Sequence, residues 1–136
     1  MGLDTSFDAW HGPYSAFTRW RHAVAEAAGY AVWKVVTDAG PWDTIMIDWG
    51  HVPEGALYGM WDKTPDDPFL ILFTHSDCEG NIFPEQAGPL ADALEAILPK
   101  FPAVETHGLR SNQEITLQFI RGLREAVIKN APVEFH

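Results

Sequence analysis

The segment Phe69-Leu70-Ile71-Leu72-Phe73-Thr74-His75-Ser76-Asp77-Cys78-Glu79-Gly80 decides how the rest of this sequence is interpreted. Its first half is an apolar run that follows Pro68, and such a short, bounded run is typical of a strand buried on both faces. Its second half brings together five side chains that could carry chemistry, from His75 to Glu79. Because binding and catalytic residues concentrate in loops held by a rigid scaffold, we expect the functional site just after this strand.

The order of the other predicted elements favours an α+β fold. We expect strands at 3–7, 31–36, 44–48 and 56–60, turns at 10–13 and 38–41, a single helical turn at 84–87, and helices at 14–28, 89–98 and 112–129. Ser111 and Glu114 have the spacing of a capping box at the start of the last helix. The sequence therefore predicts one domain, residues 1–136, in which a small mixed or antiparallel sheet is covered by about three helices.

Composition narrows the classes of partner. The chain has 136 residues, a net charge of −10 and a single cysteine, Cys78. One cysteine excludes an internal disulfide and fits a reducing cytosol. The absence of a basic leader or an apolar run of about 20 residues predicts a soluble, cytoplasmic protein without a membrane partner. The negative charge argues against binding a nucleic-acid polymer, but a few arginines can still form a pocket for a small anion.

Aromatic residues are concentrated in the first half of the chain. All six tryptophans lie there: Trp10, Trp20, Trp33, Trp42, Trp49 and Trp61. Core and interface packing explains such residues without any ligand. The alternative is that some of them form a stacking surface for a planar ligand such as a purine.

The loop after the apolar run allows several kinds of site. His75 and Asp77 could bind a metal with a further histidine, although no recognised zinc motif is present. Cys78 could be a nucleophile together with His75 or His107. Ser76 and backbone amides could instead face a phosphate while Asp77 or Glu79 accepts ribose hydroxyls. The purely structural alternative is that Ser76 and Asp77 stabilise a turn.

The start of the first predicted helix is a second candidate region. His11, Tyr14 and Ser15 lead into it, and free N–H groups at a helix N-terminus favour an anion, unless Ser15 or Gly12 merely caps the helix. Arg21 borders the apolar stripe of that helix, and Arg110 precedes the last helix. The predicted ligand-binding set is Trp10, His11, Tyr14, Ser15, Arg21, His75, Ser76, Asp77, Glu79 and Arg110, with no metal, cofactor or catalytic residue assigned.

Several short motifs are spread along the chain. They are Gly2-Leu3-Asp4-Thr5, Trp10-His11-Gly12, Tyr14-Ser15-Ala16-Phe17, Trp20-Arg21, His75-Ser76-Asp77-Cys78, Phe119-Ile120 and Pro132-Val133-Glu134-Phe135-His136. Together and in this order they resemble a family of small phage-encoded proteins, whereas residues 31–60 match it little. Where that family often has a second cysteine this chain has Ala87, so a paired-cysteine metal site has no support.

The resemblance implies a role against host defence in the cytoplasm of an infected bacterium. One class of phage anti-defence protein, the sponge, binds a nucleotide immune signal and withholds it from its receptor. Sequestin and Lockin are sponge families for signals derived from ADP-ribose, and this chain is similar to them in size. The implied function is sequestration, without chemistry, of a small phosphorylated nucleotide such as an ADP-ribose derivative or a cyclic nucleotide, by a homo-oligomer.

Two other classes of function stay open from the sequence. A small hydrolase would use His75, Asp77 and a further histidine, with or without a metal. A protein-binding inhibitor of a host factor would use exposed aromatic side chains as its contact surface.

Overall fold

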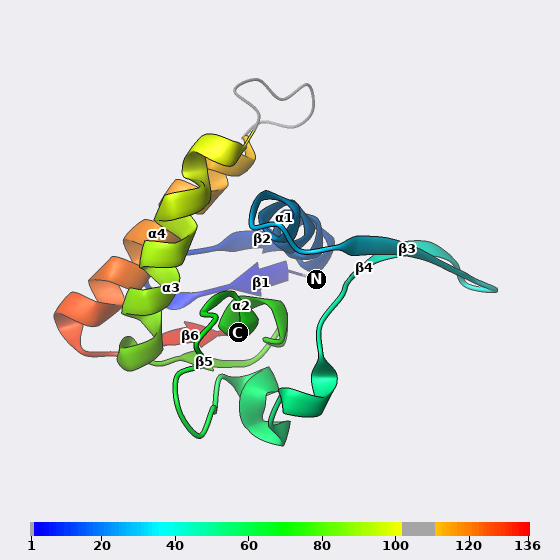
Figure 1. Cartoon of the computed structure of the whole chain (residues 1–136). Coiled ribbons are helices and arrows are strands. Elements are labelled where there is room, and N and C mark those ends of the chain that lie inside the picture. The colour runs from blue at the N-terminus through cyan, green and yellow to red at the C-terminus, as the bar shows by residue number, and fades with distance from the viewer. Residues whose placement is uncertain (1, 102–110) are drawn as a thin grey trace.

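A computed structural model describes residues 2–101 and 111–136. The two ends of the chain meet in the fold (Figure 1). Strand β1 (Gly2–Asp4) pairs with β2 (His11–Pro13), and β5 (Gly80–Ile82) pairs with β6 (Val133–Phe135), both antiparallel. The backbone groups of Asp4 and His136 exchange two hydrogen bonds of 2.9 Å, which continue the hydrogen bonding from β1 to β6.

A hairpin forms the third antiparallel pair of the described residues. Its strands are β3 (Val32–Thr37) and β4 (Gly40–Ile45), joined by a tight turn. The hairpin projects away from the helices (Figure 1). Consequently Trp33 is 62% exposed and Val36 is 75% exposed.

Helices complete the α+β domain predicted from the sequence. They are α1 (Tyr14–Ala27), α2 (Phe69–Phe73), α3 (Pro84–Ile97) and α4 (Asn112–Lys129), with single 3-10 turns or short 3-10 segments at η1 (Ser6–Asp8), η2 (Trp49–His51), η3 (Glu54–Tyr58) and η4 (Leu98–Lys100). Helices α3 and α4 lie side by side (Figure 1). The predicted cap of α4 is confirmed, since the Ser111 side chain accepts a hydrogen bond from the Glu114 N–H at 3.1 Å.

The core is centred on aromatic side chains of α1, of α4 and of Trp10, which precedes β2. Trp20 stacks on Trp10 with ring centroids 5.3 Å apart and packs against Phe119 at 4.8 Å. The Trp20 indole N–H donates to the buried Thr116 hydroxyl at 3.0 Å. Buried indoles usually find such a partner, so this hydrogen bond fixes α1 against α4 as well as filling the core.

The strand predicted at the apolar run is wrong: Phe69–Phe73 is the helix α2. Asp67 accepts a hydrogen bond from the Phe69 N–H at 3.1 Å, and Pro68 has a helical φ of −63°. Phe69 and Phe73 then stack one helical turn apart. A short apolar run has no periodicity that separates strand from buried helix, so the Asp-Pro start signal decided the outcome.

Other predicted elements also differ from the structure. The strand expected at 3–7 ends at Asp4, and the strand expected at 44–48 is instead β4 at Gly40–Ile45, which begins inside the turn expected at 38–41. The strand expected at 56–60 is replaced by the 3-10 segment η3, and the turn expected at 10–13 contains strand β2. The helical turn at 84–87 and the helix expected from Pro89 form one continuous helix, α3, with Pro89 inside it. Pro89 is tolerated there because it lies on the exposed side, where water can solvate the carbonyl that loses its N–H donor.

Within residues 2–101 and 111–136, no helix is both long enough and apolar enough to span a bilayer.

Candidate ligand-binding site

His75 is a buried side chain that connects several segments. Its Nδ1 lies 2.8 Å from the Ser76 carbonyl oxygen and its Nε2 lies 3.0 Å from the Asn81 carbonyl oxygen. The ring also packs on Phe135 of β6 with centroids 4.1 Å apart. Because both ring nitrogens face backbone carbonyls, neither is available to act as a base or to bind a ligand in this conformation.

Burial lowers the pKa of His75 below its usual value of 6.5. The Ser76 and Asn81 carbonyls raise this pKa and the charge of Arg21 lowers it, but removal from water is the largest cause. Below pH 6.5 the unfolded chain therefore binds a proton that the folded chain does not yet bind. The free energy of unfolding therefore keeps the full contribution of His75 above pH 6.5 and loses it progressively as the pH falls toward the lowered pKa.

We expect His75→Gln to reduce the acid sensitivity of the fold. Urea unfolding between pH 7.5 and 5.5 should show a smaller loss of stability for this variant than for the wild type, because Gln does not titrate. His22→Gln is the comparison, since burial also lowers the pKa of His22, which is less buried. An unchanged pH dependence in His75→Gln would contradict the assignment.

The other polar residues of the loop mainly hold the loop itself together. The Ser76 hydroxyl accepts hydrogen bonds from the N–H groups of Cys78 at 3.2 Å and Glu79 at 3.3 Å. Ser76 is buried, Asp77 is half-buried, and Cys78 and Glu79 are exposed. The turn-stabilising role considered for Ser76 is thus present.

Arg21 joins α1 to the end of α2. Its Nη1 donates to the carbonyl oxygens of His75 at 2.6 Å and Leu72 at 3.3 Å. Its guanidinium also lies over the Phe17 ring at 4.6 Å. Burial lowers the pKa of Arg21 to about 10, while the charge of Asp77 raises it. The structure therefore brings Arg21, His75, Ser76 and Asp77 together.

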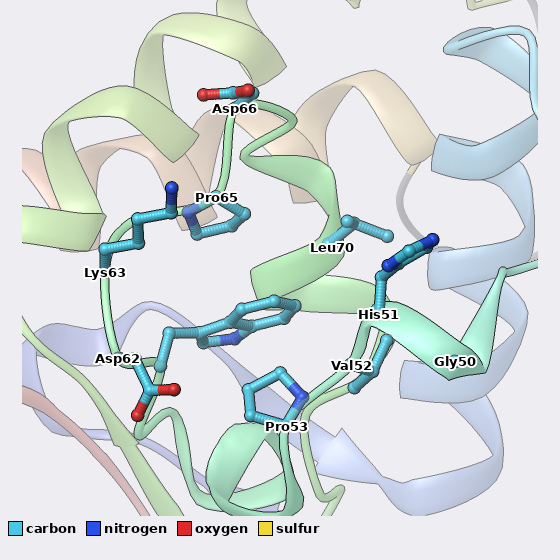
Figure 2. Close-up of a pocket in the computed structure, with 10 residues that line it drawn as sticks. Gly50, His51, Val52, Pro53, Asp62, Lys63, Pro65, Asp66 and Leu70 are labelled. Carbon is cyan, nitrogen blue, oxygen red and sulfur yellow. The ribbon is translucent and has the colours of Figure 1, made fainter.

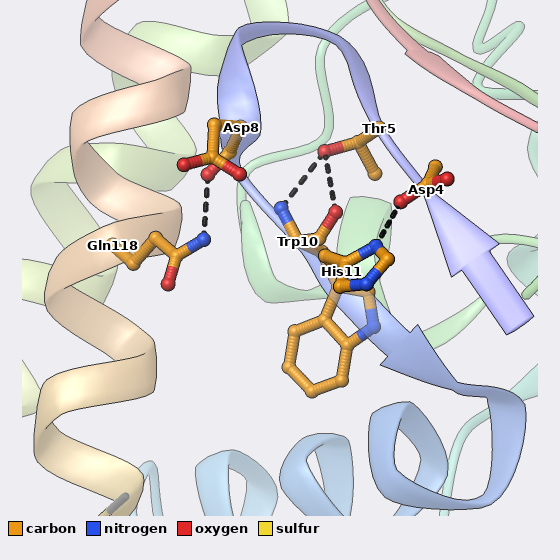
Figure 3. Close-up of polar contacts among 6 residues, drawn as sticks. All are labelled: Asp4, Thr5, Asp8, Trp10, His11 and Gln118. Carbon is orange, nitrogen blue, oxygen red and sulfur yellow. Dashed lines mark hydrogen bonds and ion pairs between the residues drawn. The ribbon is translucent and has the colours of Figure 1, made fainter.

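The residues around the start of α1 are placed differently from one another. Trp10 is only 5% exposed and belongs to the core. His11 is exposed on β2 and contacts Asp4 of β1, and this hydrogen bond raises the pKa of His11 (Figure 3). Tyr14 is half-buried and Ser15 is exposed; Pro13 occupies the N-cap, so neither Ser15 nor Gly12 caps this helix.

The two predicted regions do not share a pocket. Trp10 and His11 line a small pocket of about 120 Å³ beside α4, where Gln118 is fixed by a hydrogen bond to the Asp8 carbonyl (Figure 3). None of the best-formed pockets of residues 2–101 and 111–136 includes His75, Ser76, Asp77 or Glu79. Arg110 lies outside the described residues. Ligand contacts for this set stay predictions.

A larger pocket lies instead between η2, the segment 61–66 and the start of α2. Its volume is about 570 Å³, within the range of about 300–1,000 Å³ typical of small-molecule sites. The residues that line it are Gly50, His51, Val52, Pro53, Trp61, Asp62, Lys63, Pro65, Asp66 and Leu70. Figure 2 shows Pro53, Val52, Pro65 and Leu70 around one hollow, with His51 at its edge. We call it the Trp61 pocket.

Polar groups of the Trp61 pocket are few and largely unused. The Trp61 indole N–H is screened from water and has no hydrogen-bond acceptor among the described residues. Lys63 is exposed and forms no ion pair within the described part of the chain, and Asp62 and Asp66 are also exposed. A buried N–H without a partner is unfavourable by about 1–3 kcal/mol, so a ligand acceptor that reached it after the Trp61 ring turned would be stabilising.

This pocket was not predicted from the sequence. Its walls come from loops and 3-10 turns rather than from periodic elements, so no hydrophobic pattern predicted it. One signal was available: Trp61, Asp62 and Lys63 lie between Pro53 and Pro65, and a large aromatic residue in a proline-bounded loop is a candidate for contact with a ligand.

Among the described residues, no group of three or more His, Cys, Asp or Glu side chains is arranged to hold a metal ion. Comparisons with protein-family models, curated proteins and solved structures found no match to this chain.

Proposed function

We propose that this chain is a non-enzymatic binding protein that sequesters a small phosphorylated nucleotide in the Trp61 pocket. The planar base would stack on Trp61, and the Trp61 indole N–H would donate a hydrogen bond to an acceptor atom of the base. Lys63 would attract the phosphate, and the exposed carboxylates of Asp62 and Asp66 would accept ribose hydroxyls. Stacking of a base on an aromatic side chain contributes about 1–3 kcal/mol, which suits a binding role that needs no chemistry.

The observation that carries the proposal is a nucleotide-sized pocket whose Trp61 donor has no acceptor in the described part of the protein. The placement of His75 also favours binding over hydrolysis, since both of its ring nitrogens face carbonyl oxygens. The resemblance to small phage proteins adds the biological setting, in which the bound nucleotide is an immune signal and binding it blocks host defence.

Calorimetry with a panel of ADP-ribose derivatives and cyclic dinucleotides tests the proposal. We expect at least one of these compounds to bind and to be recovered intact by chromatography after the protein is denatured by heat. Absence of binding across the panel, or conversion of a bound compound into products, would refute sequestration.

We extend the proposal to a homo-oligomer built through the β3–β4 hairpin. Two-stranded hairpins are marginally stable by themselves, and this one exposes Trp33 and Val36 to solvent. Asp43 places a charge on β4, whereas β3 carries the apolar side chains of Val32, Trp33, Val35 and Val36. Light scattering of the purified chain should give an integral multiple of 15.2 kDa greater than one, and a monomer at high concentration would contradict it.

A further inference from the structure

A second cavity also borders η2, which contributes Trp49 to it. It has a volume of about 140 Å³, equal to roughly four or five times the 30 Å³ that a water molecule occupies in the liquid. Helix α1 provides Thr18, Arg21 and His22, and the segment from β4 to η2 provides Asp43, Thr44, Ile45, Ile47 and Trp49, with Phe73 of α2 beside them. We call it the Arg21 cavity.

Four side chains that can donate hydrogen bonds meet at the Arg21 cavity. Arg21 uses Nη1 for the carbonyls of α2, and its Nε and Nη2 groups have no acceptor among residues 2–101 and 111–136. The hydroxyls of Thr18 and Thr44 and the ring of His22 likewise make no hydrogen bond to the described residues. By contrast, the hydroxyls of Thr74 and Thr116, on other helical segments, donate to carbonyls one turn earlier.

Arg21 has no carboxylate at ion-pair distance. Within the described residues its half-buried guanidinium forms no ion pair, and the charge of Asp77 acts on it only from farther away. Buried charges are usually paired, because an isolated charge away from water is strongly destabilising. An anion in the cavity would supply the missing counter-charge and would accept the unused N–H and O–H groups.

One group in the cavity opposes an anion. Asp43 contributes a carboxylate, which is partly neutralised by Lys34 across the hairpin at 3.7 Å. Asp43 is 46% exposed, so its charge is screened by water more than the charge of Arg21 is. Removing the charge of Asp43 should therefore strengthen binding of an anion and weaken binding of a cation.

We propose that the Arg21 cavity binds a small tetrahedral oxyanion, either free inorganic phosphate or a phosphate group of a larger ligand. The guanidinium of Arg21 provides the charge, and the hydroxyls of Thr18 and Thr44 and the ring of His22 provide further hydrogen bonds. The cavity is separate from the Trp61 pocket, so this site does not depend on nucleotide binding there.

Calorimetric titration of the whole chain with sodium phosphate, and separately with sodium sulfate, tests the site. Thr18→Val removes one hydroxyl without changing shape or charge and should weaken binding about tenfold, as expected for a hydrogen bond to a charged group. Asp43→Asn should strengthen binding about fivefold or more by removing like-charge repulsion. Arg21 itself is left unchanged, because its replacement would also release the carbonyls at the end of α2.

Arg19→Gln is the matched control, since Arg19 is an exposed cation of the same helix that does not line the cavity. Binding should stay within about twofold of the wild type, because a surface charge has little local effect. No binding of either anion, or equal affinities in Thr18→Val, Asp43→Asn and wild type, would overturn the proposal. If a nucleotide displaces phosphate from the cavity, the natural ligand is a phosphate group of a larger molecule. If phosphate binding is unaffected by the nucleotide, the natural ligand is free phosphate.

Discussion

Gly59→Ala should unfold the protein or reduce its stability by more than about 4 kcal/mol, well beyond the usual effect of a single substitution. A Cβ on Gly59 would overlap the carbonyl oxygen of Asn81 and lie 2.9 Å from its carbonyl carbon. Asn81 belongs to β5 and its carbonyl oxygen lies 3.0 Å from His75 Nε2, so this carbonyl cannot move without disturbing the buried ring. The Gly59 carbonyl is fixed too, by a 2.7 Å hydrogen bond from Gln86 of α3.

Gly29→Ala separates this steric overlap from backbone strain. Gly29 has a φ of +89° and Gly59 a φ of +79°, so an alanine is strained at both positions. Nothing lies within 4 Å of a Cβ placed on Gly29, and there we expect a loss of only about 1 kcal/mol. Urea unfolding followed by circular dichroism compares the two variants. Equal stabilities would mean that η3 and β5 do not approach each other as closely as described.

The sequence predicted the elements that carry their own signals. Helix α4 has a cap at Ser111 and an apolar stripe at helical spacing, and both are present in the structure. Helix α2 was not predicted, because five apolar residues contain no period. Hydrogen bonds with Asp67 at its start and with Arg21, which lies far away in the sequence, stabilise it. Tertiary contacts of this kind cannot be inferred from a local pattern.

The candidate site was predicted less well, for a related reason. A cluster of polar residues after an apolar run suggested a ligand, and Arg21 does lie beside His75 and Asp77 as a shared site would require. However, the Ser76 hydroxyl and both ring nitrogens of His75 face the protein's own backbone. Sequence shows that a side chain is polar but not whether the fold itself already supplies its partners.

Trp61→Phe and Trp61→Ala should weaken nucleotide binding to different extents if the base stacks in the Trp61 pocket. Phenylalanine keeps an aromatic face but lacks the indole N–H, so we expect a loss of about threefold to tenfold, the value of one neutral hydrogen bond. Alanine also removes the stacking surface, and the loss should reach about a hundredfold or more. Because Trp61 packs against the core, the phenylalanine variant keeps the test valid if the alanine variant unfolds.

Lys63→Ala tests the phosphate end of the same ligand, and Lys100→Ala is its control. Lys63 lines the pocket, whereas Lys100 is an exposed lysine of η4 that does not, so both variants lose one positive charge but only one loses it near the proposed ligand. Calorimetry should show weaker binding for Lys63→Ala, more so at low salt, and wild-type affinity for Lys100→Ala. Wild-type affinity in both Lys63→Ala and Trp61→Phe would place the nucleotide elsewhere on the protein. Sequestration itself would then still stand, because it is refuted only if the wild-type chain binds no nucleotide or converts a bound nucleotide into products.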